Sequence, residues 1–107
     1  MRYVGPPNLH DATIERVEHE RSALRVRIRA DDGQVISAEF RGVTQVLATA
    51  AEGMMLYAVA EMRSDGPQRR FVFANWYDPG EEGIERQLEV MAEDVHFRSE
   101  RPWWKFW

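Results

Sequence analysis

The sequence predicts an all-β or β-rich α+β domain, an antiparallel sheet or sandwich of about six strands. Apolar and polar residues alternate at a period of two in several short segments. Turn-forming residues recur near positions 21, 32, 52, 66 and 80, a spacing that is typical of antiparallel meanders and not of βαβ units. The 107 residues fit one domain, with residues 99–107 as an aromatic C-terminal tail.

The first half of the chain predicts three strands. The clearest spans residues 24–30, where Leu24, Val26 and Ile28 share one face and arginines occupy the other. An Asp-Gly turn follows, and residues 35–41 complete a hairpin. Residues 9–20 are expected to form a bent or bulged first strand, because their apolar pattern changes phase near residues 12–13.

The middle of the chain, residues 43–62, is compatible with both helix and strand. Its Ala, Leu, Met and Glu content favours a short helix near residues 44–51, ended by Gly53. Farther along, residues 54–63 alternate at a period of two and favour a strand. This strand would place five apolar side chains on one side, namely Met54, Leu56, Ala58, Ala60 and Met62.

The last third predicts two more strands. Residues 64–68 form a turn, and residues 70–77 read as an aromatic strand. Phe71 and Phe73 share one face of it, while Val72, Ala74 and Trp76 share the other, so a central position in a sheet is expected. A final strand spans residues 87–99, with a helix over residues 84–93 as the alternative.

Composition and charge exclude several classes of function. A net charge of −4 argues against a nucleic-acid binder, which needs a basic face. No segment is apolar enough to span a membrane, and the N-terminus lacks a secretory pattern. With no cysteine there is neither a disulfide framework nor a thiolate metal site, so we expect a cytoplasmic protein without cofactor or metal.

No residue pattern indicates catalysis. His10 and Asp11 would point to opposite faces of a strand, so we expect them to serve backbone hydrogen bonding at its start. His19 falls in a charged turn, and His96 is expected to point outward from the last strand. No nucleophile elbow or phosphate-binding loop is present. The sequence therefore assigns no catalytic, cofactor-binding or metal-binding residues and predicts that the protein is not an enzyme.

Two segments are candidates for contact with a protein partner. Residues 78–94 hold seven acidic residues and a single base, an arrangement that suits a basic partner. The tail places four large aromatic residues among its last five, which are expected to bury against this domain, a second copy or another protein. The partner-binding candidates are Glu81, Glu82, Glu85, Trp103, Trp104, Phe106 and Trp107.

The chain resembles small β-rich bacterial domains, largely uncharacterised, that include some immunity proteins of polymorphic toxin systems. The likeness rests on residues 9–14 at the first strand, Glu39–Val43 at the end of the third, Phe71–Phe73, and the last strand. It covers roughly residues 8–98 and implies a cofactor-free domain that acts by binding, such as by occluding a toxin. The aromatic tail and the Ala-rich residues 46–51 have no counterpart in it.

These observations predict a non-enzymatic, cytoplasmic protein-binding domain, immunity-like in its action. One alternative is a small ligand-binding or enzymatic β-domain with its site between the sheet and the aromatic tail. It requires a closed pocket with convergent polar groups such as His10 and a carboxylate. Another is a structural homodimer in which Trp103, Trp104 and Trp107 cross to the second copy.

Overall fold

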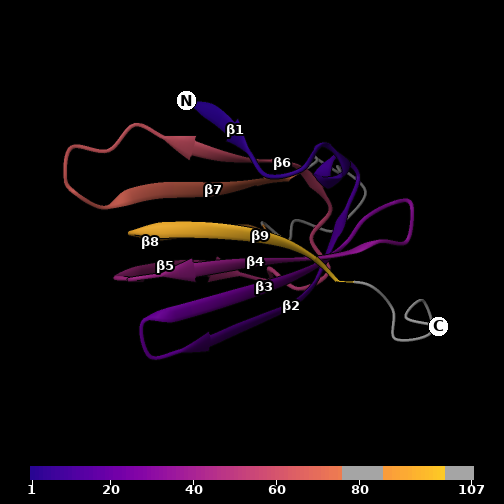
Figure 1. Cartoon of the computed structure of the whole chain (residues 1–107), viewed down its shortest axis with the longest axis horizontal. Helices are drawn as coiled ribbons and strands as arrows, with labels where there is room; N and C mark the ends of the chain where they lie inside the picture. The colour runs from indigo at the N-terminus through magenta and orange to yellow at the C-terminus, as the bar shows by residue number, and fades with distance from the viewer. Residues whose placement is uncertain (76–85, 101–107) are drawn as a thin grey trace.

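The computed structural model describes residues 1–75 and 86–100, which form two antiparallel sheets. The five-stranded sheet has the order β1-β6-β7-β8-β5, and the four-stranded sheet has the order β2-β3-β4-β9 (Figure 1). The five-stranded sheet consists of β1 (Arg2–Val4), β6 (Leu56–Met62), β7 (Arg69–Asn75), β8 (Gln87–Ala92) and β5 (Gln45–Thr49). The four-stranded sheet consists of β2 (Thr13–Glu20), β3 (Ala23–Arg29), β4 (Val35–Arg41) and β9 (Asp94–Glu100). One 3-10 turn, η1 (Pro7–Leu9), follows β1.

The predicted antiparallel β fold is confirmed, although the described residues contain nine strands instead of about six. The hairpin of β3 and β4 forms as expected. Leu24, Val26 and Ile28 are buried, and the residues between them are exposed. The aromatic strand β7 lies at the centre of its sheet, with Phe71 and Phe73 in the core.

Both helix alternatives are wrong within the described residues. In place of a helix near residues 44–51, the chain forms the edge strand β5, which pairs with β8 from Gln45↔Met91 to Thr49↔Gln87. Residues 87–92 form β8, so no helix occupies the described part of residues 84–93. Pairing with a neighbouring strand satisfies the backbone of both segments and outweighs their helix propensity.

The expected single strand over residues 87–99 is divided at Glu93, and its two halves belong to different sheets. Its neighbour bends with it: β4 continues through Gly42 into β5, so the pair β4–β9 becomes the pair β5–β8. The backbone N–H of Glu93 donates to Arg41 O over 2.9 Å, and that of Thr44 donates to Met91 O over 2.9 Å. Gly42 has φ +62°, a left-handed conformation that favours glycine.

Two β-bulges explain why the side chains of β2 and β6 face other directions than the sequence pattern predicts. In β2 the bulge lies at Glu15, between Ile14 and Arg16, instead of near residues 12–13, and Leu9 belongs to η1 instead of a strand. In β6 the bulge follows Leu56, so Val59 turns inward and the expected single row from Met54 to Met62 is broken. Each bulge shifts the period-two pattern by one residue.

Residues 11–14 also pair with residues 53–56, which joins the two sheets at the start of β2. Asp11 N–H donates to Leu56 O over 2.9 Å, and Ile14 N–H donates to Met54 O over 2.9 Å. The core between the sheets is therefore bounded by this junction on one side and by the bend at Glu93 on the other.

Three phenylalanines hold the two sheets together. The ring of Phe40, from β4, lies 5.3 Å from that of Phe71 and 5.8 Å from that of Phe73. All three side chains are buried, so their contact excludes water from the middle of the core.

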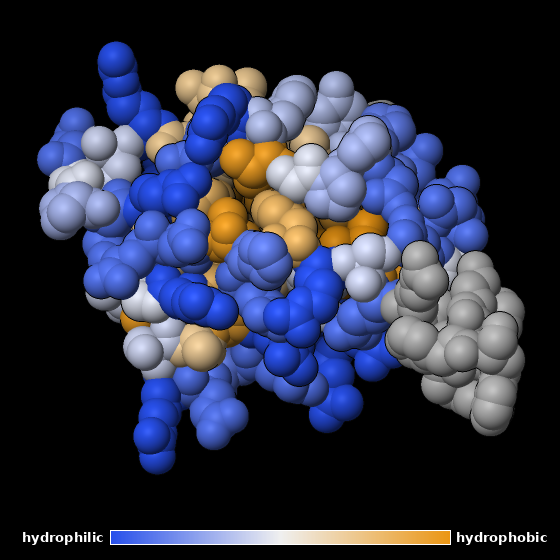
Figure 2. Space-filling model, viewed as in Figure 1, coloured by the Kyte–Doolittle hydropathy of each residue, from blue (hydrophilic) through white to orange (hydrophobic). Residues whose placement is uncertain are grey.

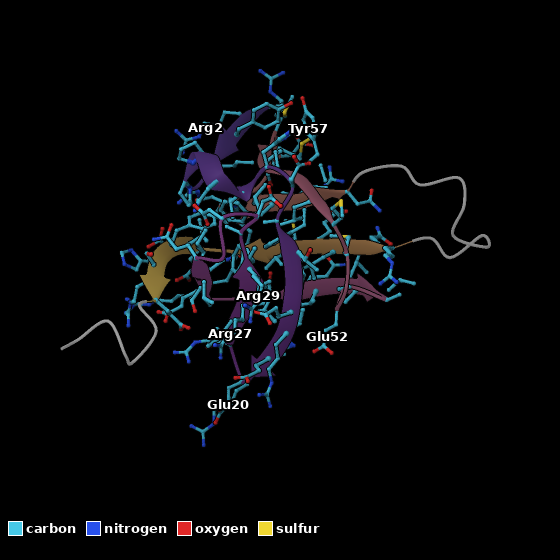
Figure 3. All side chains as sticks on the ribbon, turned by 90° about the vertical axis from the view of Figure 1, so that its right-hand side faces the viewer. Arg2, Glu20, Arg27, Arg29, Glu52 and Tyr57 are labelled. Carbon is cyan, nitrogen blue, oxygen red and sulfur yellow. The ribbon has the colours of Figure 1, made fainter. Side chains whose placement is uncertain are left out.

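The outer face of the four-stranded sheet carries cross-strand ion pairs. Arg25 meets Glu39 at 3.2 Å, and Arg29 meets Glu15 at 3.1 Å. The whole group contains five arginines and four glutamates, namely Arg16, Arg25, Arg27, Arg29, Arg98, Glu15, Glu18, Glu39 and Glu100. In Figure 3, Arg27 and Arg29 lie below Arg2 and Tyr57, which are at the top of that view.

Replacement of Phe40 tests this account of the core. We expect Phe40→Ala to lower the free energy of unfolding by about 3–5 kcal/mol, because it removes buried surface and leaves a cavity between the sheets. Tyr3→Ala is the control, since Tyr3 is 59% exposed, and its effect should stay below about 1 kcal/mol. Urea unfolding of both variants provides the measurement, and equal losses would contradict the account.

Candidate protein-binding groove

Two strands of the described structure have a free edge beside the same opening. β9 pairs only with β4 and β1 only with β6 among the described residues, so each is the last strand of its sheet. The outer edge of such a strand presents backbone N–H and C=O groups that can pair with another extended chain.

Three side chains of β9 lie on the core face beside its free edge. Val95, Phe97 and Ser99 pair with Phe40, Ala38 and Ile36 of β4, all of which are buried, so the three β9 side chains share the core face. Val95 and Phe97 are only partly buried and Ser99 is exposed, because no strand covers their free side. Figure 2 shows apolar surface at the centre of this face, ringed by hydrophilic residues.

A hollow of about 440 Å³ opens near the end of β9, and we refer to it as the β9 hollow. Its lining residues are Gly5, Pro6, Asn8, Gln34, Ile36, Phe97, Arg98 and Ser99. Polar contacts join its two rims: Asn8 Nδ2 donates to Gln34 Oε1 over 2.8 Å, and Gln34 Nε2 donates to Ser99 Oγ.

Glycine at position 5 lets the loop after β1 lie against β9. Gly5 has φ +89°, and a Cβ there would lie 2.7 Å from Leu9 Cδ1 and 2.9 Å from Phe97 Cε1. A larger residue would push this loop away from the Phe97 ring, so the shape of the hollow depends on this glycine.

A cluster of charged side chains lies at the start of β9. Arg69 of β7 donates from Nη2 to Glu61 Oε1 over 2.8 Å and from Nε to Glu61 Oε2 over 3.0 Å. Arg2 of β1 donates to the same Glu61 Oε1 over 3.0 Å, and Arg69 Nη1 reaches Asp94 Oδ1 of β9 at 3.2 Å. The cluster therefore ties β1, β6 and β7 to the first residue of β9. We call the partly covered core face of β9, from this cluster to the β9 hollow, the β9 groove.

The cluster changes the titration of Glu61. Hydrogen bonds from Arg69 are the main cause that lowers the pKa of Glu61 from 4.5 to about 2, with a smaller contribution from Arg2. Arg69 also lies over the Phe71 ring, with 5.1 Å between Cζ and the ring centroid, which adds a cation–π contact at the edge of the core.

A second, smaller depression of about 220 Å³ lies beside His10. His10 is in the turn after η1 instead of a strand, and its Nδ1 lies 3.3 Å from Tyr57 O, while Nε2 lies 3.8 Å from Asp11 Oδ2. The Tyr57 ring lies 5.3 Å from the His10 ring and 6.2 Å from the Tyr3 ring, and Figure 3 places Tyr57 beside β1. His96 is exposed on β9, as expected. His19 is exposed too, but it belongs to strand β2 and not to a turn, because β2 continues to Glu20.

Within residues 1–75 and 86–100, no three His, Cys, Asp or Glu side chains are close enough to hold a metal ion. The same residues include no helix with the length and apolar character needed to span a membrane.

The seven partner-binding candidates all lie outside the described residues. Glu81, Glu82 and Glu85 belong to the gap between β7 and β8, and the four aromatic residues of the tail follow β9. Three acidic residues of the segment 78–94 are described: Glu89 pairs with Arg70, Asp94 pairs with Arg69, and Glu93 is exposed.

Sequence patterns missed the β9 groove because three distant segments form it. Residues 5–8, 34–36 and 97–99 meet only after both sheets have formed. One local signal was present: the apolar period slips between Ala92 and Val95, where the strand leaves one sheet for the other.

Comparisons of this chain with protein-family models, with curated proteins and with solved structures found no match.

The pKa of Glu61 predicts a pH dependence of stability. Because its pKa is lower in the folded than in the unfolded state, its contribution is complete above pH 4.5 and disappears as the pH falls toward 2. Glu61→Gln should therefore cost about 1 kcal/mol at pH 7, since the pair is partly exposed, and almost nothing near pH 2.

Urea midpoints of the wild type and Glu61→Gln, measured from pH 7 down to pH 2, test this prediction. A difference between the two proteins that does not shrink across that range would show that the carboxylate is not held ionised by its arginines.

Proposed function

We propose that this protein is a protein-binding domain that takes up an extended segment of its partner along the β9 groove. The observation that carries the proposal is the free edge of β9 directly beside partly buried apolar side chains. A partner strand that paired with this edge would gain backbone hydrogen bonds and at the same time cover Val95 and Phe97.

The groove also supplies polar groups that would orient the segment. The β9 hollow bears the amide and hydroxyl groups of Asn8, Gln34 and Ser99, and the opposite end bears the ion pair of Arg69 with Asp94. An apolar middle between two polar ends suits a strand whose apolar side chains alternate with polar ones.

The resemblance of residues 8–98 to domains that include immunity proteins indicates a class of partner, a toxin domain inside the cytoplasm. In this proposal the acidic residues of segment 78–94 would help to attract a basic partner, and the β9 groove would hold it. Binding would block the toxin without any chemical step.

Capture from lysate of the source cell tests the proposal with a matched pair of variants. Ser99→Arg puts a long charged side chain into the groove at an exposed position, and we expect at least a tenfold loss of captured partner. His96→Arg introduces the same residue on the same strand but at an exposed position on the outer face, and its capture should equal that of the wild type.

Thermal melting of both variants checks that the fold is intact. The proposal fails if immobilised wild type retains no protein above empty beads, or if Ser99→Arg retains as much of the same protein as His96→Arg does.

A further inference from the structure

The described part of the chain ends at the rim of the β9 hollow. Glu100 is the last residue of β9 and pairs with Val35, and the next pair inward, Ser99 with Ile36, lines the hollow. The seven residues 101–107 therefore start beside it. Fully extended, seven residues reach about 23 Å, which is ample to return over a neighbouring cavity.

The composition of these seven residues matches the lining of the hollow. They include three tryptophans and one phenylalanine, and an aromatic ring needs apolar surface to cover it. Pro6 and Phe97, which are partly buried, provide such surface. An indole N–H also needs an acceptor, and the side-chain oxygens of Asn8, Gln34 and Ser99 lie on the rim.

One carboxylate near the hollow is available to the basic residues of the segment. The segment 101–107 carries Arg101 and Lys105 and no acidic side chain. Asp32 lies next to the hollow, with its Oδ2 at 3.5 Å from Asn8 Nδ2, and is exposed at the β3–β4 turn. A cation that passed this rim would meet this carboxylate and also the guanidinium of Arg98, which lines the hollow and lies 3.7 Å from Glu39 Oε2.

We propose that residues 101–107 occupy the β9 hollow of their own chain, with the rings of Trp103 and Trp104 against Pro6 and Phe97. The tail then covers one end of the β9 groove and competes with a partner segment. Only this regulatory consequence rests on the proposed function, because the tail can fill the hollow whether or not a partner exists.

The absence of cysteine from the chain allows a direct test by disulfide formation in the purified full-length protein. Asn8→Cys is combined with Lys105→Cys, which leaves all four aromatic residues of the tail in place. The control combines Lys105→Cys with Asp65→Cys, in the β6–β7 turn at the opposite end of the molecule from the end of β9 (Figure 1). Gln34→Cys with Lys105→Cys gives a second position on the rim, should Asn8→Cys disturb η1.

We expect the rim pairs to form an intramolecular disulfide at least about tenfold faster than the control pair at low protein concentration, because docking raises the effective concentration of the two thiols. Replacing Trp103, Trp104, Phe106 and Trp107 by serine should reduce the rate to that of the control. Equal rates for rim and control pairs, or a rate that does not change without the aromatic rings, would overturn the proposal.

A covalent dimer as the main product would also overturn it, because the tail would then occupy the hollow of a second copy. The reaction contains no partner protein, so its outcome is separate from that of the capture experiment. If Ser99→Arg loses the captured partner while the rim and control pairs form disulfides at equal rates, the partner site is supported. The same result rejects the docking of residues 101–107 in the β9 hollow.

Discussion

The shared bend of two paired strands at Gly42 and Glu93 determines the rest of this structure. It carries β4 into β5 and β9 into β8 without breaking their pairing, so one strand pair contributes to both sheets. The second neighbour of β8 is β7, which begins at Arg69 opposite Ala92, so no strand continues beside β9 past the bend among the described residues. The free edge and the partial exposure of Phe97 follow from this missing neighbour.

The period-two pattern of the sequence was sufficient to predict a strand where buried and exposed residues alternate along its whole length. Leu24, Val26 and Ile28 have only polar residues between them, and the register of β3 with β4 follows from that alternation. β5 could not be found in this way, because four of its five residues are exposed and it is held by pairing with β8. The bulges at Glu15 and after Leu56 likewise depend on neighbouring strands, and period-two reasoning cannot locate them.

The candidate site was less predictable than the fold for a related reason. The sequence directed attention to unusual composition, namely the acidic segment and the aromatic tail, while the groove consists of ordinary residues such as Pro6, Ile36 and Ser99. Their importance comes from position: they meet at the end of a strand that lacks a neighbour. The aromatic residues 101–107 follow Glu100, the last residue of β9, directly beside this hollow.

The charges on the outer face of the four-stranded sheet are arranged in pairs of opposite sign. The ion-paired group contains five arginines and four glutamates, so most of its charge cancels between neighbouring side chains. Alternating charges of this kind produce an electric field that decays over a short distance, in contrast to a surface patch of a single sign. Their mutual attraction weakens as ionic strength rises, because dissolved salt screens exposed charges.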